Sequence, residues 1–305
     1  MGVDSLKRFT RTAWTLALLY AIVQTQAIAT ETAGTIYPNG AESFLTAAVP
    51  PPGYYLIDYV NYYEAQRLLG AHGEDLAPNF RVDAFANAVR YVHWGKERFL
   101  GAQLGQQVVI PYVSLDVSAA GGHQHKSGFG DITIDPLLLS YQNAKFHFVL
   151  TPEVNVPTGA YVKGDLANIG RNYYNFEPVL AFTYTGAKNF EIDTKLMYDF
   201  NGTNPATNYK SGNEFHADYA IGYNRRGMFA GVAGYFYQQT SDDLQAGNKV
   251  GPDGFRGRVF SYGPDIHMSL AKGFLAFKWE HEVGVKNRTQ GDKFWLKLIQ
   301  RVGNE

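Results

Sequence analysis

The sequence contains no cysteine among its 305 residues. This absence excludes a disulfide framework, a thiolate metal site and a cysteine nucleophile together. Charged residues are also scarce, at 18% of the chain, and the 27 basic and 28 acidic residues nearly cancel. Because no basic excess is present, a nucleic-acid partner is not expected.

Long apolar runs are missing as well, except near the N-terminus. Three basic residues, Lys7, Arg8 and Arg11, precede an apolar stretch over 13–23, and Ala27-Ile28-Ala29 follows it. A basic start, a short apolar stretch and an A-x-A site are typical of a secretory signal peptide, and the stretch is too short for a membrane anchor. We therefore expect residues 1–29 to be cleaved during export.

What the chain does contain is aromatic residues (15%) and 32 glycines. Aromatic side chains favour pleated strands, and glycine supplies turns. Apolar and polar residues also alternate over 190–200, 215–223, 260–270 and 275–280. Since successive strand side chains face opposite sides, each of these segments has one apolar and one polar face, and an all-β fold is predicted.

The lengths of the connections distinguish a barrel from a soluble sandwich. Long connections (64–79, 119–128, 157–171, 201–212, 240–256) alternate with tight ones near 94–96, 143–144, 186–188, 225–227 and 272–273. A transmembrane barrel has short periplasmic turns, longer external loops and an even strand count. We predict an antiparallel transmembrane barrel of about 12 strands over residues 53–305, with both termini periplasmic and residues 30–52 as a periplasmic or entrance segment. The strands are expected near 53–63, 80–92, 99–118, 129–141, 145–156, 172–185, 189–200, 213–224, 228–239, 257–271, 273–285 and 292–302, with bulges at the prolines inside them.

Several short stretches in this order resemble a known family. They are Pro50–Tyr55, Gly130–Pro136, Val156–Tyr161, Tyr209–Gly212 followed by Glu214 and His216, Tyr237–Thr240 with Asp242, and Gly263-Pro264. Together they are similar to the outer-membrane proteins named after the meta-cleavage pathway of phenol degradation, over about residues 37–300. One departure is the C-terminus, which ends Val302-Gly303-Asn304-Glu305 without the terminal aromatic residue of many outer-membrane barrels.

The resemblance implies a barrel in the outer membrane of a Gram-negative cell that conducts small hydrophobic or aromatic compounds toward their catabolism. Its expected partners are outer-membrane lipid, lipopolysaccharide, those solutes and, during biogenesis, the barrel-assembly machinery. No cofactor and no catalytic residue are expected. The alternatives are a non-conducting structural or surface-interaction barrel and an outer-membrane acyl hydrolase.

If the apolar strand faces contact lipid, the polar faces line the lumen. Mixed charges on these faces either neutralise one another as structural pairs or line a permeation path and set its selectivity. The candidate lumen residues are His147, Glu153, Asp193, Lys195, His216, Asp218, Asp265, His267, Lys278 and Glu280.

Two further chemistries are weighed and not expected. Ser261 and Ser269 share a strand face with Asp265 and His267, but no Gly-x-Ser-x-Gly elbow accompanies them. The stretch 121–125 offers two histidines without a clear third ligand, so a flexible polar loop and no metal are expected there. Tyrosines crowd the segment 54–63 and fit either an interfacial girdle or an aromatic-lined entrance.

Overall fold

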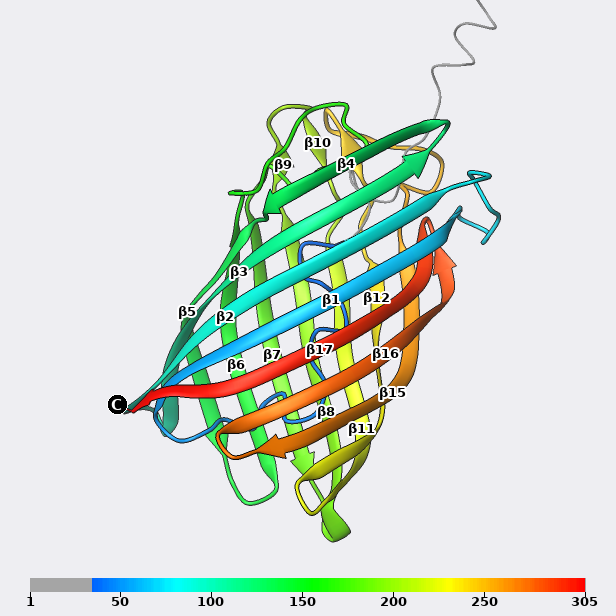
Figure 1. Cartoon of the computed structure of the whole chain (residues 1–305). Coiled ribbons are helices and arrows are strands. Elements are labelled where there is room, and N and C mark those ends of the chain that lie inside the picture. The colour runs from blue at the N-terminus through cyan, green and yellow to red at the C-terminus, as the bar shows by residue number, and fades with distance from the viewer. Residues whose placement is uncertain (1–34, 305) are drawn as a thin grey trace, which may run out of the picture.

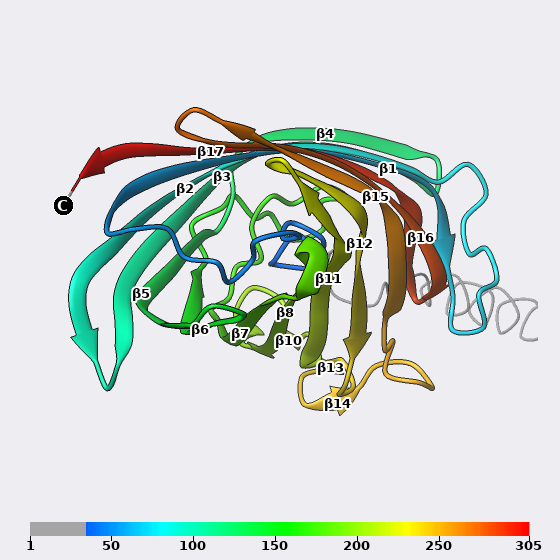
Figure 2. The same cartoon turned by 90° about the horizontal axis from the view of Figure 1, so that it is seen from below.

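The chain forms a closed barrel of antiparallel strands, shown from the side in Figure 1 and along its axis in Figure 2. This computed structural model describes residues 35–304, so the expected signal peptide lies outside the described residues. Each of the twelve strands pairs with its neighbour along the chain, and β1 pairs with β17 to close the sheet. The strands are β1 (Gly53–Leu69), β2 (Arg81–Phe99), β3 (Ala102–Ala119), β5 (Ile132–Gln142), β6 (Phe146–Val156), β7 (Asn175–Thr185), β8 (Phe190–Asn201), β11 (Glu214–Arg225), β12 (Met228–Gln239), β15 (Arg258–Leu270), β16 (Gly273–Lys286) and β17 (Arg288–Asn304).

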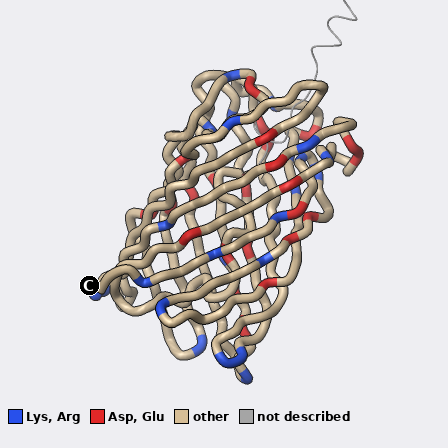
Figure 3. The backbone as a smooth tube through the Cα atoms, in the orientation of Figure 1, with Lys and Arg blue, Asp and Glu red and all other residues tan. Residues whose placement is uncertain are grey.

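The twelve strands leave short turns at one end of the barrel, the turn end, and long connections at the other, the loop end, except between β16 and β17, which Asn287 alone separates (Figure 1). One turn contains a 3-10 helix, η1 (Ala187–Asn189). Basic residues gather at the turn end (Figure 3). Among residues 35–304, no helix combines the length and the apolar character needed to cross a membrane.

Side-chain burial alternates along the strands as the sequence predicts. In β15, Phe260, Tyr262 and Ile266 are exposed, whereas Ser261 and Asp265 are buried. The outer surface therefore carries a band of exposed aromatic and aliphatic side chains, and the polar faces point into the barrel. This is the arrangement that lipid requires, because the closed sheet pairs its backbone polar groups internally.

Three connections differ from the prediction. The connection expected between the last two strands, over 286–291, is reduced to Asn287, because β16 and β17 extend to Lys286 and Arg288. The tight turn expected at 94–96 is wrong, because β2 continues past an irregularity after Trp94 and turns at Leu100-Gly101, both with positive φ (48° and 86°). The connection 119–128 is not a flexible loop, because β4 (Gly122–Phe129) folds back on β3 as a hairpin. The histidines weighed as metal ligands, His123 and His125, are exposed on this strand.

The expected bulges at prolines are present in part. Pairing between β5 and β6 is irregular between Ile134 and Leu139, around Pro136. Pairing between β7 and β8 is interrupted at Pro178, and the β15–β16 ladder is interrupted at Pro264. A proline has no N–H to donate, so these interruptions follow from its chemistry.

A small second sheet at the loop end consists of β9 (Thr203–Asn204), β10 (Tyr209–Lys210), β13 (Leu244–Gln245) and β14 (Asn248–Lys249). Asp243 holds it together: its carboxylate accepts hydrogen bonds from Tyr209 Oη (2.5 Å), Gly212 N (2.7 Å) and Gln239 Nε2 (2.7 Å). Burial raises the pKa of Asp243 to about 6, against the opposing effect of these donors.

This loop sheet is expected to be more stable at pH 5 than at pH 7.5. Because the folded-state pKa of Asp243 is raised, the stabilisation is complete below the unfolded pKa of about 4 and is lost as the pH rises through about 6, with a total of up to about 3 kcal/mol. Hydrogen exchange of the amides in 203–212 and 243–249, corrected for intrinsic rates, should show the difference. In Asp243→Asn, which carries no charge at either pH, protection should be equal at both; equal protection in the unchanged protein would contradict the assignment.

Candidate permeation path

Residues 35–52, here called the internal segment, run through the inside of the barrel (Figure 2). At the loop end, Arg171 Nη2 donates a hydrogen bond to Thr35 O (3.0 Å). At the turn end, Pro50 and Lys272 line the same cavity, and β1 begins at Gly53. The described part of the predicted segment 30–52 therefore lies within the barrel and crosses it from the loop end to the turn end.

Asp218 on β11 anchors the upper part of the internal segment. Its carboxylate accepts hydrogen bonds from Tyr37 Oη (2.7 Å), Gly40 N (2.7 Å) and Glu42 N (2.9 Å). Gly40 has φ +86°, and a Cβ atom there would lie 2.2 Å from Glu280 Oε2. Only glycine allows the segment to turn this close to the barrel wall.

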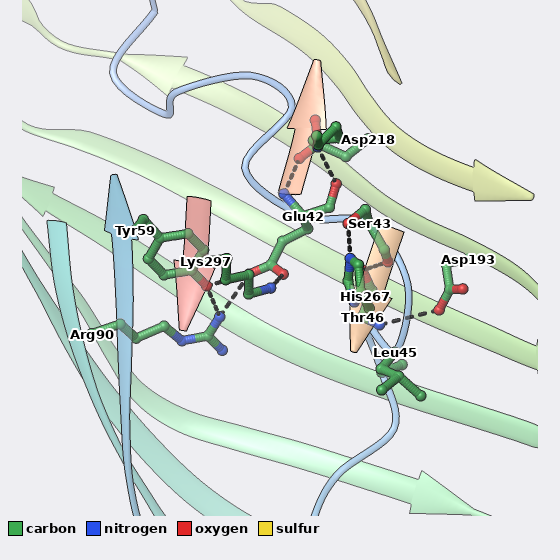
Figure 4. Close-up of polar contacts among 12 residues, drawn as sticks. Glu42, Ser43, Leu45, Thr46, Tyr59, Arg90, Asp193, Asp218, His267 and Lys297 are labelled. Atoms are coloured by element: carbon green, nitrogen blue, oxygen red, sulfur yellow. Dashed lines mark hydrogen bonds and ion pairs between the residues drawn. The ribbon is translucent and has the colours of Figure 1, made fainter. Parts of the chain in front are cut away.

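Further lumen side chains bind the lower part of the segment through its backbone and Ser43 (Figure 4). Wall carboxylates and a hydroxyl accept hydrogen bonds from backbone N–H groups of the segment that would otherwise be buried without partners. The contacts are Ser43 Oγ with His267 Nε2 (3.0 Å), Leu45 N with Glu191 Oε1 (3.1 Å), Thr46 N with Asp193 Oδ1 (3.1 Å) and Ala47 N with Thr183 Oγ1 (2.9 Å).

The side chain of Glu42 joins the segment to the opposite wall (Figure 4). Its carboxylate accepts from Arg90 Nη1 (2.8 Å), Lys297 Nζ (2.5 Å) and Tyr59 Oη (2.7 Å), which belong to β2, β17 and β1. Glu42 is 6% exposed and Lys297 also 6%, so the ion pair is shielded from water. A pair of this kind is costly to break because each charge left behind is desolvated.

Two cavities lie on either side of these contacts. The cavity toward the loop end has a volume of about 720 Å³ and the cavity toward the turn end about 860 Å³. Both are lined by the same five residues, which mark the constriction between them. The constriction residues are Glu42, Arg90, Gln107, Glu153 and Lys195.

The loop-end cavity has an apolar wall formed by inward-facing residues of β2 and β3. The polarity of the residues alone would not distinguish the inner from the outer faces of these two strands. Their inner faces carry small and branched apolar side chains next to the charged constriction. The wall consists of Val82, Ala84, Ala86, Ala88, Val109, Pro111, Val113, Leu115 and Val117. The lumen is therefore apolar on one side and charged on the other.

The predicted lumen residues face the interior, but they do not form one cluster. Eight of the ten are buried, and several are paired: Lys278 with Glu280 (3.1 Å), Asp265 with His267 (3.2 Å) and Lys195 with Glu153 (3.8 Å). The side chain of Lys195 is 11% exposed at the constriction, and His147 lies near a turn, where its ring contacts Gln142 (3.1 Å). Those that hydrogen-bond to the internal segment are Asp193, Asp218, His267 and Lys278, and Lys195 Nζ lies 3.9 Å from the ring centroid of Tyr37.

The structure brings several residues to the path that are not among the predicted lumen residues. Glu42, Arg90 and Lys297 form the ion-pair cluster of the constriction, and Glu177 lies buried on β7. Arg90, Glu177 and Lys297 are isolated charges that only the inward parity of their strand positions could have indicated, and Glu42 precedes the first strand, where no such parity exists. Of the early tyrosines, Tyr55 and Tyr59 are buried inside the barrel and do not belong to an outer girdle.

The geometry does not support a hydrolytic triad. Ser261 Oγ accepts from Tyr235 N, and Ser269 Oγ donates to Gly227 O, so neither contacts His267. Ser43 Oγ and Asp265 Oδ1 both approach the same ring nitrogen, Nε2 of His267, at 3.0 and 3.2 Å. A general base needs its carboxylate on the other nitrogen, so this serine is not activated by an oriented imidazole.

Comparisons with known proteins agree with the barrel. The family described as "Putative MetA-pathway of phenol degradation" matches residues 65–298. A solved structure, the COG4313 outer membrane channel from Pseudomonas putida F1, superposes with a TM-score of 0.75 at 16% identity, covering 84% of this chain and 98% of that one. The transport unit of the autotransporter AIDA-I from Escherichia coli (TM-score 0.49, 8% identity, 85% and 93% covered) and the CymD monoaromatic hydrocarbon channel (0.47, 9%, 82% and 89%) are more distant. No curated protein matches the sequence.

Proposed function

The chain belongs to the MetA-pathway phenol-degradation family, and on that premise we propose that it is an outer-membrane channel for the passive uptake of small hydrophobic or aromatic compounds. The observation that carries the proposal is the two-sided lumen. An apolar wall of β2 and β3 lines a cavity of about 720 Å³, large enough for a single-ring aromatic molecule, directly above a charged constriction.

The mechanism is diffusion down a gradient maintained by catabolism of the solute. An aromatic ring enters the loop-end cavity at little cost in free energy, because the apolar wall replaces the water around it. The constriction then requires a displacement of the internal segment, whose hydrogen bonds and ion pairs must be exchanged for contacts with solute and water. Fixed charges of both signs there favour neither anions nor cations strongly.

The orientation in the membrane follows from the same proposal. The exposed apolar band of the strands would contact lipid, the long loops would face the outside with lipopolysaccharide, and the turn end would face the periplasm. Export through a cleaved segment 1–29 and insertion by the barrel-assembly machinery are parts of this proposal. We assign the protein no catalytic residue.

A non-conducting structural barrel is the second candidate, and the internal segment favours it. The segment crosses the lumen from end to end and is bound to several strands. A permanently closed barrel would show no flux above empty liposomes although it is folded, and this separates the two candidates.

Benzoate is expected to enter liposomes that contain the folded barrel faster than a sugar of similar size. Ala86→Glu, which places a charge in the apolar wall, should lower benzoate flux roughly tenfold, the equivalent of about 1.4 kcal/mol in the barrier, and leave sugar flux unchanged. Ala86→Met adds similar bulk without charge and should lower benzoate flux much less. Equal loss in both variants would show that volume, and not the apolar surface, limits passage.

A further inference from the structure

Three neighbouring strands place a histidine and two carboxylates together inside the barrel. Glu177 on β7, Asp199 on β8 and His216 on β11 are 0–1% exposed. His216 Nε2 lies 2.7 Å from Asp199 Oδ2 and 3.7 Å from Glu177 Oε2, and potential ligand atoms of all three lie within 4.8 Å of one another. This triad belongs neither to the constriction nor to the anchors of the internal segment.

Glu177 is the feature that the described fold leaves unexplained. Both of its carboxylate oxygens are buried without a hydrogen-bond partner among the described residues, and so is Nδ1 of His216. The other buried lumen carboxylates have a defined neighbour: Asp218 binds the internal segment, whereas Asp265 and Glu280, which also have oxygens without a hydrogen-bond partner, lie beside His267 (3.2 Å) and Lys278 (3.1 Å). A buried carboxylate that lacks both donors and a cation is expensive, so a missing positive partner is indicated.

The local charge points to a divalent cation. The charged groups that act most strongly on Glu177 are Glu153, Asp199 and Lys195. Lys195 pairs with Glu153 at 3.8 Å, so the charge that compensates Glu177 and Asp199 must come from a protonated His216 or from a bound cation. One ion of charge +2 neutralises these two carboxylates while His216 remains neutral and offers a ring nitrogen.

Surrounding side chains hold one ligand in place. Asn175 Nδ2 donates to Asp199 Oδ1 (2.7 Å), which leaves Oδ2 directed at His216. Asn155 Nδ2 in turn donates to Asn175 Oδ1 (2.9 Å), and Thr133 Oγ1 donates to Asn155 Oδ1 (2.5 Å). Such a chain of donors behind a carboxylate is typical of the support that metal ligands receive.

We propose that Glu177, Asp199 and His216 bind one divalent transition-metal ion, with Zn²⁺ as the ion that fits the donor set. One imidazole nitrogen and two carboxylate oxygens suit Zn²⁺, with a fourth position for water. Calcium and magnesium take six or more oxygen ligands, which this triad does not provide. The ion would join β7, β8 and β11 just beneath Tyr37, whose ring centroid lies 5.5 Å from that of His216.

The test uses the full-length folded barrel in detergent, stripped with a chelator and then incubated with Zn²⁺ or Co²⁺. We expect one Zn²⁺ per chain by elemental analysis after gel filtration, and visible Co²⁺ absorption bands of a low-coordinate site. Glu177→Gln and His216→Asn should each lower the affinity at least about tenfold, because the loss of even an outer-shell partner of a metal ligand typically costs about 10- to 100-fold. His267→Asn removes the imidazole of the buried Asp265–His267 pair and is the matched control that should leave binding unchanged.

Metal content below one ion per ten chains in the unchanged protein, or equal binding in Glu177→Gln and in the control, would overturn the proposal. In that case Glu177 and Asp199 share a proton, and Glu177→Gln stabilises the barrel without any effect of Zn²⁺. Heat-modifiable migration in gels establishes that each variant is folded, and Asp199→Asn replaces any variant that is not. Benzoate flux is a separate measurement, so failure of this site leaves the proposed channel function untouched.

Discussion

Deleting residues 35–47 is expected to raise the conductance of the barrel by roughly an order of magnitude, because the pore dimensions then depend on the wall alone. The deleted residues include Glu42, which separates the two cavities of about 720 and 860 Å³, and the segment anchored by Asp218. Without them the cavities merge into one water-filled lumen. Single-channel recording in planar bilayers measures the effect, and uptake of a sugar into liposomes should rise in parallel.

The closed ladder of twelve strands does not depend on the internal segment, so the variant should still migrate as a folded, heat-modifiable barrel. Shortening the loop by removing residues 246–252 is the matched control, because these residues line neither cavity. That deletion should leave the conductance unchanged. An unaltered conductance in the 35–47 variant would mean that another part of the chain closes the lumen, and the loop 157–171, whose residue Leu166 lines the loop-end cavity, would be the next to delete.

The barrel itself could be predicted because its strands obey a local rule. A side chain at an inward position must suit the lumen, and a side chain at an outward position must suit lipid. Each strand therefore shows the alternation of period two on its own, independently of the other strands. The predicted strand 228–239 coincides with β12, and 273–285 differs from β16 by one residue. The error at 94–96 arose because Gly95 resembles a turn residue, whereas the chain turns at Leu100-Gly101.

The internal segment could not be predicted, because nothing local specifies it. Residues 35–52 have no period, and their partners are far away in the chain: Glu42 contacts Arg90 and Lys297, and Tyr37 contacts Asp218. The sequence placed five of the carboxylates on polar strand faces, and these side chains are buried in the structure: Glu153, Asp193, Asp218, Asp265 and Glu280. The sequence could not show that several of these carboxylates bind backbone N–H groups, because this role depends on which segment of the chain fills the lumen.

The roles of the charged residues are divided in a way that the alternatives raised by the sequence did not anticipate. Asp218, Asp193 and His267 hold the internal segment, Glu153 and Lys195 line the constriction, and His216 belongs to the proposed metal site. The charged lumen residues therefore need not be either all structural pairs or all residues of a permeation path. On the proposed function, the pairs at the constriction, Glu42 with Arg90 and with Lys297, would have to separate when a solute passes.

Glu42→Gln is expected to increase the fraction of time that the channel is open by two orders of magnitude or more, since breaking a buried ion pair costs about 3–5 kcal/mol and each 1.4 kcal/mol is tenfold. The substitution keeps the shape of the side chain but removes the charge that holds Arg90 and Lys297. The loss weakens the closed state, in which the pair exists. Single-channel recording, which detects rare openings, measures the change in the open fraction.

The same substitution should also make the open channel prefer anions. Around the constriction lie three cations, Arg90, Lys195 and Lys297, and three carboxylates, Glu42, Glu153 and Asp135, the last bonded to Gln107. Removing the charge of Glu42 makes the constriction more positive by one unit, so the reversal potential in a salt gradient should shift toward that of the anion.

Asp218→Asn separates the two effects. It loosens the internal segment at Tyr37 and Gly40, away from the constriction charges, so it should raise the open fraction without a comparable shift in selectivity. If Glu42→Gln changes selectivity but not open fraction, ions already pass beside a segment that stays in place, and the segment is then a lining of the pore. If it changes neither, Glu42 does not border the conducting path, and the route lies elsewhere in the lumen.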